Sequence, residues 1–332
     1  MVQRPEVSVV IPTRNRPELV PRAVRSALDQ TLRDIEVIVV VDGPDESTRG
    51  ALAEYADDQR LRLVELPESG GAPNARNVGA QEARAPFVAL LDDDDEWLLE
   101  KLETQLALAK ASSHALPIVS CRMSVRTPRA EFVMPRRLPE PGQPLSEYFT
   151  VRRGLFHGDG FIQTSTIMAP TELLRKVPFT NGLRRMQELD WTLRALEIEG
   201  VGLEYAEQAL VIWYADENRQ RISLDSPWRQ QYQWLKESRS RVTPRAYAAL
   251  AMGVISSMAA DSGDPRVFLD LLREAHRHGR PGLTDYVTFM QVWLVPSRPR
   301  RAVRDFVLGR RRAREARSRA MTHVSKARTF TE

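Results

Sequence analysis

The chain has 332 residues, of which 42% are hydrophobic and 28% charged, and its formal net charge is +4. The hydrophobic fraction can fill a core, which excludes wholesale disorder. A single cysteine, Cys121, excludes an intramolecular disulfide framework and a multi-cysteine metal site. The N-terminus shows no signal-peptide pattern. The longest uncharged stretch, residues 246–260, is shorter than the roughly 20 residues that span a bilayer, so we expect a buried helix there.

The net charge is divided unevenly along the chain. Residues 298–332 hold twelve Lys+Arg and three Asp+Glu, a net charge of +9, which leaves −5 for the rest. An acidic body with a basic tail is not the profile of a nucleic-acid-binding domain. The composition of the tail is compatible with binding to an anionic membrane surface. It is equally compatible with a solvated, charged helix formed by the tail itself, which packs on the body or on a partner. We therefore expect a cytoplasmic protein, peripheral at the inner face of the membrane if the tail binds lipid.

The first part of the chain alternates short β-branched runs with helical patterns. The predicted strands cover residues 7–11, 35–41, 61–66 and 87–91, and the predicted helices cover 19–28, 47–55 and 97–110, with a further helix that begins at Pro73. This alternation predicts an α/β fold with a doubly wound, mostly parallel, Rossmann-like sheet. Ligands of such sheets bind beyond the carboxyl ends of the strands, so the residues after each strand are the candidates for a site.

The later part of the chain has fewer strands. Residues 161–168 resemble a strand, residues 189–197 a helix, and the pattern beyond Trp228 is helical to about Gly279. We expect one domain over residues 1–225, divided near residue 115 into two halves, followed by a helical extension over 226–296 and the basic tail over 297–332.

Four consecutive carboxylates, Asp92 to Asp95, follow the predicted strand 87–91. They repel one another unless a positive charge compensates, and hard cations such as Mg²⁺ or Mn²⁺ prefer carboxylate oxygens. A solvated acidic turn that precedes a helix is the alternative.

Three other segments lie where strands end or helices begin. Asp42 ends the second strand, and residues 12–15 (PTRN) end the first. Each could bind a ligand or cap a turn. Arg76 lies in the first turns of a predicted helix, where a phosphate partner would offset the helix dipole, although an ordinary surface arginine is the alternative. The glycines make neither a Rossmann fingerprint nor a P-loop.

Together these segments resemble the inverting GT-A glycosyltransferases of family 2. The resemblance rests on VSVVIPTRN (7–15), ALDQT (27–31), VVVDG (39–43), GGAPNARNVG (70–79) and LDDDDEWLLEKL (91–102), and it extends in order over residues 5–225. It implies a nucleotide-sugar donor, UDP-linked as the family prior, a divalent Mn²⁺ or Mg²⁺ ion, and a hydroxyl acceptor that is a carbohydrate, a lipid-linked sugar or a small molecule.

The resemblance also implies roles for individual residues. Asp42 would contact the base, Arg76 the diphosphate, Asp92 or Asp93 the ribose, and Asp94, with Asp92, the metal. The remaining donor contacts would come from Pro12, Thr13, Arg14 and Asn15. Arg221 would also contact the donor, although the resemblance is weaker in its region. Family members more often have a paired Asp where this chain has Val-Asp at 41–42.

The general base is expected in the segment MQELDWTLR (186–194), because the family carries an acidic pair six or seven residues before an arginine. Glu188 matches the base, and Asp190 matches a second acid of the family; a core-facing helix with acids in its first turn is the structural alternative. Two other functions remain open at this point. A sugar-phosphate nucleotidyltransferase normally has a Gly-rich loop where this chain has PTRN, and a nucleotide-sugar-binding protein without activity would show the same motifs.

Overall fold

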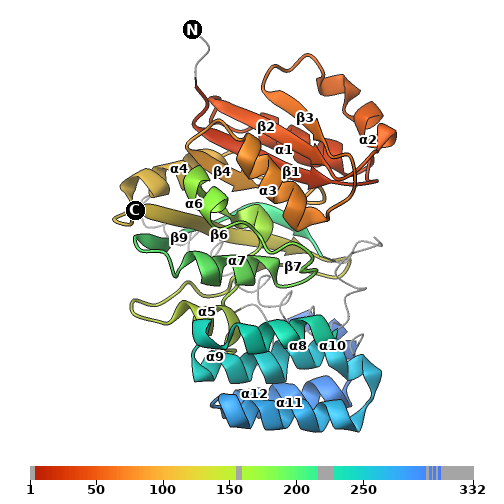
Figure 1. Ribbon diagram of the computed structural model, residues 1–332, viewed down its shortest axis with the longest axis vertical. Helices are drawn as coiled ribbons and strands as arrows, with labels where there is room; N and C mark the ends of the chain where they lie inside the picture. Colours follow the sequence, from red (N-terminus) through yellow and green to blue (C-terminus); the bar gives the residue numbers. More distant parts are fainter. Residues whose placement is uncertain are drawn as a thin grey trace, which may run out of the picture.

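The structure is a computed structural model that describes residues 4–154, 159–215, 228–296, 299–300, 302–303 and 306–307. A single mixed sheet runs through it, in the strand order β3-β2-β1-β4-β8-β6-β9-β5, with β7 paired to β6. The helices of the C-terminal part stack beyond one side of this sheet (Figure 1). The molecule is thus an α/β fold with a helical extension, as the sequence predicts.

The N-terminal half is a parallel sheet. Its strands are β1 (Val7–Thr13), β2 (Ile35–Val41), β3 (Leu61–Glu65) and β4 (Phe87–Leu90). All residues of β1 and β2 are buried, which explains why their sequences are almost continuous runs of Val and Ile. The strands pair in register, with Val7 of β1 opposite Ile35 of β2 and Phe87 of β4. The four predicted strands are confirmed to within two residues at each end.

Helices cover both faces of this parallel sheet. They are α1 (Val20–Leu28), α2 (Glu46–Ala51), α3 (Ala72–Glu82), α4 (Lys101–Ala111) and α6 (Thr171–Lys176). The apolar side chains of α1 and α4 share one core with β1 and β2, and those of α3 and α6 share the core of the opposite face. Gly79 of α3 lies so close to β1 that a Cβ atom there would overlap Val10. This close packing sets α3, and with it Arg76, against the end of the sheet.

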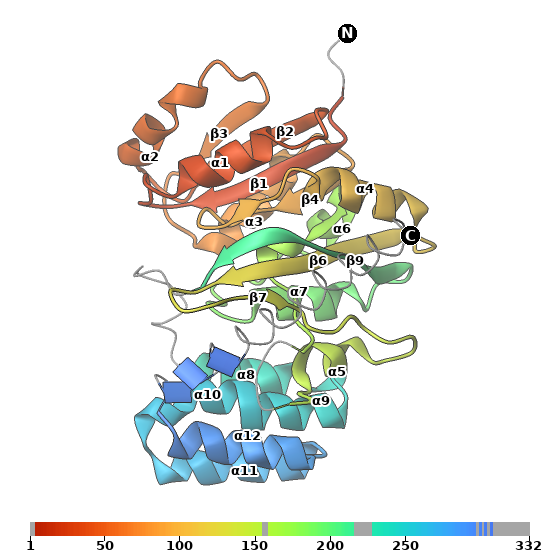
Figure 2. The same cartoon turned by 180° about the vertical axis from the view of Figure 1, so that it is seen from behind.

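The second half of the sheet is mixed rather than parallel. Its strands are β5 (Glu96–Trp97), β6 (Leu116–Arg126), β7 (Glu131–Met134), β8 (Met168–Pro170) and β9 (Val201–Tyr214). The short β8 runs antiparallel between β4 and β6. In contrast, β6 and β9 run parallel to each other (Figure 2), and their register is irregular near Cys121 and Arg122. Cys121 is buried in β6.

The predicted strand over residues 161–168 is mostly absent. Residues Thr164–Thr166 form a 3₁₀ turn, and only Met168 belongs to β8. The side chain of Gln163 accepts a hydrogen bond from the amide of Ser165, and the Thr166 hydroxyl lies 2.6 Å from the Gln163 carbonyl oxygen. Such local side-chain bonds compete with a strand ladder. The turn places Gln163 and Thr164 at the site described below.

The C-terminal extension is a stack of helices. It contains α8 (Trp228–Glu237), α9 (Pro244–Ala249), a π-helical turn (Leu250–Ile255), α10 (Ser256–Ala259), α11 (Pro265–His278) and α12 (Leu283–Leu294). Its core includes Leu183 and Leu193 from the segment around α7 (Gln187–Ala195), so the extension packs directly on the sheet-bearing part (Figure 1). The stretch 246–260 is confirmed as a largely buried helix. Among the described residues, no helix combines the length and apolarity that a bilayer crossing requires.

Candidate active site

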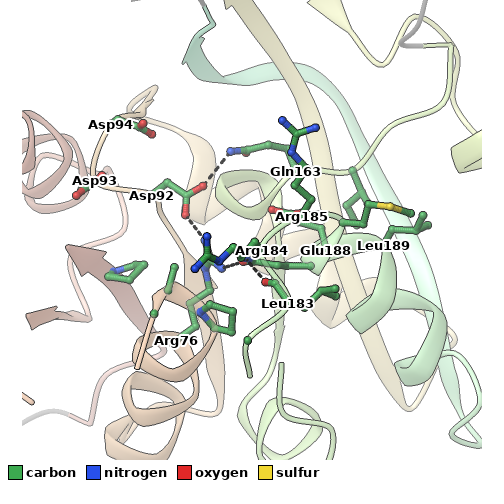
Figure 3. A pocket seen from close by; sticks show the side chains of 18 of the residues that line it. Arg76, Asp92, Asp93, Asp94, Gln163, Leu183, Arg184, Arg185, Glu188 and Leu189 are labelled. Carbon is green, nitrogen blue, oxygen red and sulfur yellow. Dashed lines mark hydrogen bonds and ion pairs between the residues drawn. The ribbon is translucent and has the colours of Figure 1, made fainter. Parts of the chain in front are cut away.

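A cavity of about 950 Å³ lies beyond the carboxyl ends of β1, β2 and β4. The loops after these strands line one side, the residues leading into α7 line another, and Leu250, Val254 and Met258 of the extension contribute apolar side chains. Figure 3 shows Asp92, Asp93 and Asp94 on the sheet side and the segment from Leu183 to Leu189 on the other. The location agrees with the position expected from the strand order.

The acidic loop after β4 is held by side chains from several elements. Asp92 accepts hydrogen bonds from the guanidinium of Arg76 (2.7 Å) and from the side-chain amide of Gln163 (3.3 Å). Asp93 accepts from the hydroxyl of Thr13 (2.8 Å) and pairs with Arg16 (2.7 Å). Removal from water raises the pKa of Asp93 to about 6 and also raises the pKa of Asp92, in spite of the neighbouring arginines. The loop is therefore short of positive charge.

Carboxylate oxygens of Asp92, Asp94 and Asp95 lie within 4.8 Å of one another. Asp95 is fully buried, and its Oδ2 accepts hydrogen bonds from Ser165 (2.6 Å) and Gln163 (2.8 Å). Its Oδ1 is buried and has no hydrogen-bond partner among the described residues. Burial and the neighbouring carboxylates raise the pKa of Asp95 well above its usual value. An oxygen-only donor set with an unsatisfied buried oxygen fits a hard divalent cation.

Residues 12–15 divide into two groups. Pro12, Thr13 and Arg14 line the cavity, and Arg14 also donates to the hydroxyl of Ser69. Asn15 does not line the cavity among the described residues; it adopts a left-handed conformation (φ 51°), and its amide donates to Asp45 (2.6 Å). Asn15 therefore shapes the turn that carries its neighbours.

Asp42 lines the cavity, but its carboxylate already has three donors in the structure. Its oxygens accept hydrogen bonds from the hydroxyl of Ser69 (2.7 Å) and from the amides of Gly70 (2.8 Å) and Gly71 (2.9 Å). Gly71 has φ 85°, a conformation that favours glycine. Asp42 thus anchors the glycine-containing loop that leads into α3, and any contact with a base would share these oxygens.

Arg76 is almost fully buried and connects the two halves of the molecule. Besides its bond to Asp92, it donates to the side-chain oxygen of Gln187 at the start of α7 (2.5 Å). Figure 3 shows its guanidinium group reaching from α3 into the cavity toward Asp92. A buried cation with partners on both sides is not an ordinary surface arginine, so the alternative considered for this residue is wrong.

Glu188 and Asp190 lie on the same helix but face different surroundings. Glu188 is half-buried, lines the cavity and accepts a hydrogen bond from the hydroxyl of Thr164. Asp190 is buried and is not among the described residues that line the cavity. Its oxygens accept hydrogen bonds from Thr180 (2.7 Å), Arg194 (2.8 Å) and the indole N–H of Trp234 (2.8 Å). The two acids are thus equipped for different tasks.

The sequence did not single out Arg16 and Gln163 as site residues, and it indicated Asp95 only as a member of the acidic run. Arg16 follows the PTRN turn directly, and Asp95 belongs to the acidic run, so their positions carried a weak signal. Gln163 carried none, because its place depends on the 3₁₀ turn. Arg221 and the basic tail beyond residue 307 lie outside the described residues.

Comparison with known proteins identifies the family. Residues 8–177 match the model of glycosyl transferase family 2, and the chain belongs to this family. The chain is therefore a glycosyltransferase, and the match includes the loops after β1, β2 and β4 that line the cavity.

Two named relatives are informative. The chain is 30% identical over 199 residues to "Putative teichuronic acid biosynthesis glycosyltransferase TuaG" of Bacillus subtilis, an alignment that covers 58% of this chain and 73% of that protein. It is 33% identical over 102 residues to "UDP-Glc:alpha-D-GlcNAc-diphosphoundecaprenol beta-1,3-glucosyltransferase WfgD" of Escherichia coli, which covers 31% of this chain and 40% of that protein.

Solved structures share the fold. The structure of S. aureus TarS residues 1–349 in complex with UDP-GlcNAc superposes with a TM-score of 0.52 at 17% identity, covering 86% of this chain and 79% of that one. The similarity extends beyond the family-model match and includes much of the chain after residue 177. At this identity the likeness concerns the fold alone.

Proposed function

We propose that the protein transfers a sugar from a UDP-linked donor to a hydroxyl group of a lipid-linked acceptor, with inversion at the anomeric carbon, in the synthesis of a cell-envelope polysaccharide. The observation that carries the reaction is the pairing, in one cavity, of the Asp92–Asp94 loop with Glu188. The acceptor and the pathway are supported by the names of two relatives, which mention a diphosphoundecaprenol-linked substrate and teichuronic acid. The reaction would then take place at the inner face of the membrane.

Glu188 is the proposed general base. The acceptor oxygen forms a bond to the anomeric carbon while its proton passes to a carboxylate oxygen of Glu188, and the bond from that carbon to the diphosphate oxygen breaks on the opposite side. Such general-base assistance contributes about 10²–10⁴-fold to the rate. Thr164 holds one oxygen of Glu188 and so orients the carboxylate. Asp190 has its oxygens occupied, and we assign it the positioning of α7 rather than proton transfer.

The donor side would bind the nucleotide through the loops after β1 and β2. Thr13, Arg14 and Asp42 line that end of the cavity, and Arg76 lies beside the acidic loop, where it can offset charge on the leaving diphosphate. A divalent Mn²⁺ or Mg²⁺ ion would be held by Asp94 and Asp92, with Asp95 beside them; when bound, it supplies further positive charge at the diphosphate. Arg221 stays a sequence-based expectation.

A panel of nucleotide sugars tests this function. With MnCl₂ present, a UDP-sugar should raise the unfolding temperature more than the GDP- and dTDP-linked sugars do, and slow hydrolysis should release UDP. Transfer to a polyprenyl-diphosphate-linked sugar, followed by NMR of the new anomeric linkage, would show inversion. A retained configuration would contradict the single-displacement mechanism, and stabilisation without any release of nucleoside diphosphate would contradict the proposed activity.

A further inference from the structure

The helix α12 of the extension carries apolar side chains on its exposed face. Leu283, Tyr286, Val287, Met290 and Leu294 of α12 form what we call the α12 stripe, and between 37% and 81% of each residue is exposed. Their spacing of three or four residues places them along one side of the helix. Exposed apolar residues are ordinary when they are single, but a contiguous row indicates an interaction surface.

The opposite face of α12 is the one that packs on the extension. It contains Asp285, Thr288, Phe289 and Val292, all of them buried. Asp285 is the one charged residue of the helix, and it pairs with Arg245 of α9 in the interior. The stripe therefore contains no charged side chain, which is unusual for a surface-facing helix.

The chain that follows α12 is strongly basic. Residues 298–332 carry a net charge of +9, and Val303 and Phe306 in the first part of this segment are also more than half exposed. Apolar side chains next to clustered arginines are the combination that binds an anionic bilayer surface: the apolar groups enter the headgroup boundary, and the arginines lie near the phosphates.

We propose that the α12 stripe and the basic segment 298–332 together dock the protein on an anionic lipid membrane. The twelve residues of α12 extend about 18 Å, less than the roughly 30 Å of a bilayer core, so the helix would lie along the surface. A second copy of the chain is a poorer occupant, because pairing two α12 stripes would bring two +9 segments close to each other. The docking goes beyond sugar transfer, since it concerns where the enzyme is held.

Vesicle flotation of the full chain tests this docking without any measurement of activity. The protein should float with phosphatidylcholine vesicles that contain phosphatidylglycerol and not with phosphatidylcholine alone, and high salt should weaken the binding. The double variant L283E/L294E should lower the vesicle affinity by about tenfold or more, because it places two carboxylates against the lipid. R310Q/R311Q/R312Q should also lower the vesicle affinity, in this case only through the loss of electrostatic attraction to the anionic lipid.

The matched control is L98E/L99E, which makes the same change at two exposed leucines just before α4, in the sheet-bearing part of the molecule. It should bind vesicles like the wild type, and all variants should unfold at the wild-type temperature. Wild-type protein that does not bind anionic vesicles would overturn the proposal, as would an L283E/L294E variant that binds them fully. A wild-type dimer that this variant converts to a monomer, with unchanged flotation, would identify the stripe as a self-association surface instead.

Discussion

Arg76 joins Asp92 to the helix that carries the proposed base: its Nη2 lies 2.7 Å from Asp92 Oδ1, and its Nη1 lies 2.5 Å from the side-chain oxygen of Gln187. The acidic loop and α7 are far apart in the sequence and belong to different halves of the molecule. One buried cation therefore sets the separation between the donor side and Glu188.

Arg76→Lys should retain the charge but lose one of the two contacts, because an ammonium group cannot reproduce the fork of a guanidinium. We expect kcat/KM to fall by about 10–100-fold through misplacement of the two sides, together with weaker donor binding by calorimetry. Arg49→Lys, at an exposed ion pair with Glu65 on the surface, is the matched control and should behave like the wild type. Unchanged kinetics of the Arg76 variant would show that the double contact is dispensable.

Glu188→Gln should abolish transfer while the donor still binds. The amide has the shape of the carboxylate but cannot accept the acceptor proton, so kcat should fall by about 10²–10⁴-fold. Donor affinity, measured by calorimetry with MnCl₂, should stay at the wild-type value. Glu197→Gln just beyond the end of α7, where the carboxylate pairs with Arg241 in a partly exposed position, is the control. A parallel collapse of donor affinity would remove Glu188 from the role of base.

Asp190→Asn should act on stability. It leaves Arg194 without its carboxylate and weakens the bonds from Thr180 and Trp234, so we expect a loss of about 1–3 kcal/mol in the free energy of unfolding, measured with urea. Trp234→Phe, which deletes only the indole donor, should cost less. Activity per folded molecule should remain substantial at low temperature. A fully stable but inactive Asp190→Asn enzyme would instead make Asp190 the base.

The acidic loop predicts how stability of the metal-free protein depends on pH. Burial raises the pKa of Asp93 to about 6 and the pKa of Asp95 well above its usual value, so the folded protein binds more protons than the unfolded chain above about pH 4. The free energy of unfolding contributed by these groups is therefore highest at low pH and falls as the pH rises through about 6. Manganese should reduce this fall, because it compensates the ionised carboxylates.

Asp95→Asn tests the same loop by mutation. Thermal unfolding in the presence of a chelator should show a smaller decrease between acid and neutral pH, and the variant should be more stable than the wild type at neutral pH, because burial no longer disfavours an ionisable carboxyl at this position. The stabilisation by manganese should shrink in the same variant. Asp57→Asn, at an exposed position, is the control. A steeper pH dependence, or an undiminished effect of manganese, would contradict the assignment of Asp95 to the metal cluster.

The sequence was sufficient for the parallel half of the fold and for the edge where the site lies. Strands that are buried on both faces are almost continuous runs of Val and Ile, which makes them recognisable in a sequence. Because parallel strands end at the same edge of the sheet, the residues that follow them lie together there. Pro12, Asp42 and Asp92 to Asp94 could therefore be placed together before any coordinates. The mixed half was harder to predict, because β5 and β8 are only two and three residues long and carry no periodicity.

Long-range packing decided the remaining features. Glu188 and Asp190 are two residues apart on a helix, so they face nearly opposite directions. The sequence of α7 alone does not show which of the two side chains faces the cavity. Trp234, more than 40 residues later, decides this, because its indole N–H donates a hydrogen bond to Asp190. Tertiary packing likewise decides that the α12 stripe is exposed. Its apolar residues predict burial, and only the packing of Phe289 and Val292 against the extension determines which side of the helix remains in contact with solvent.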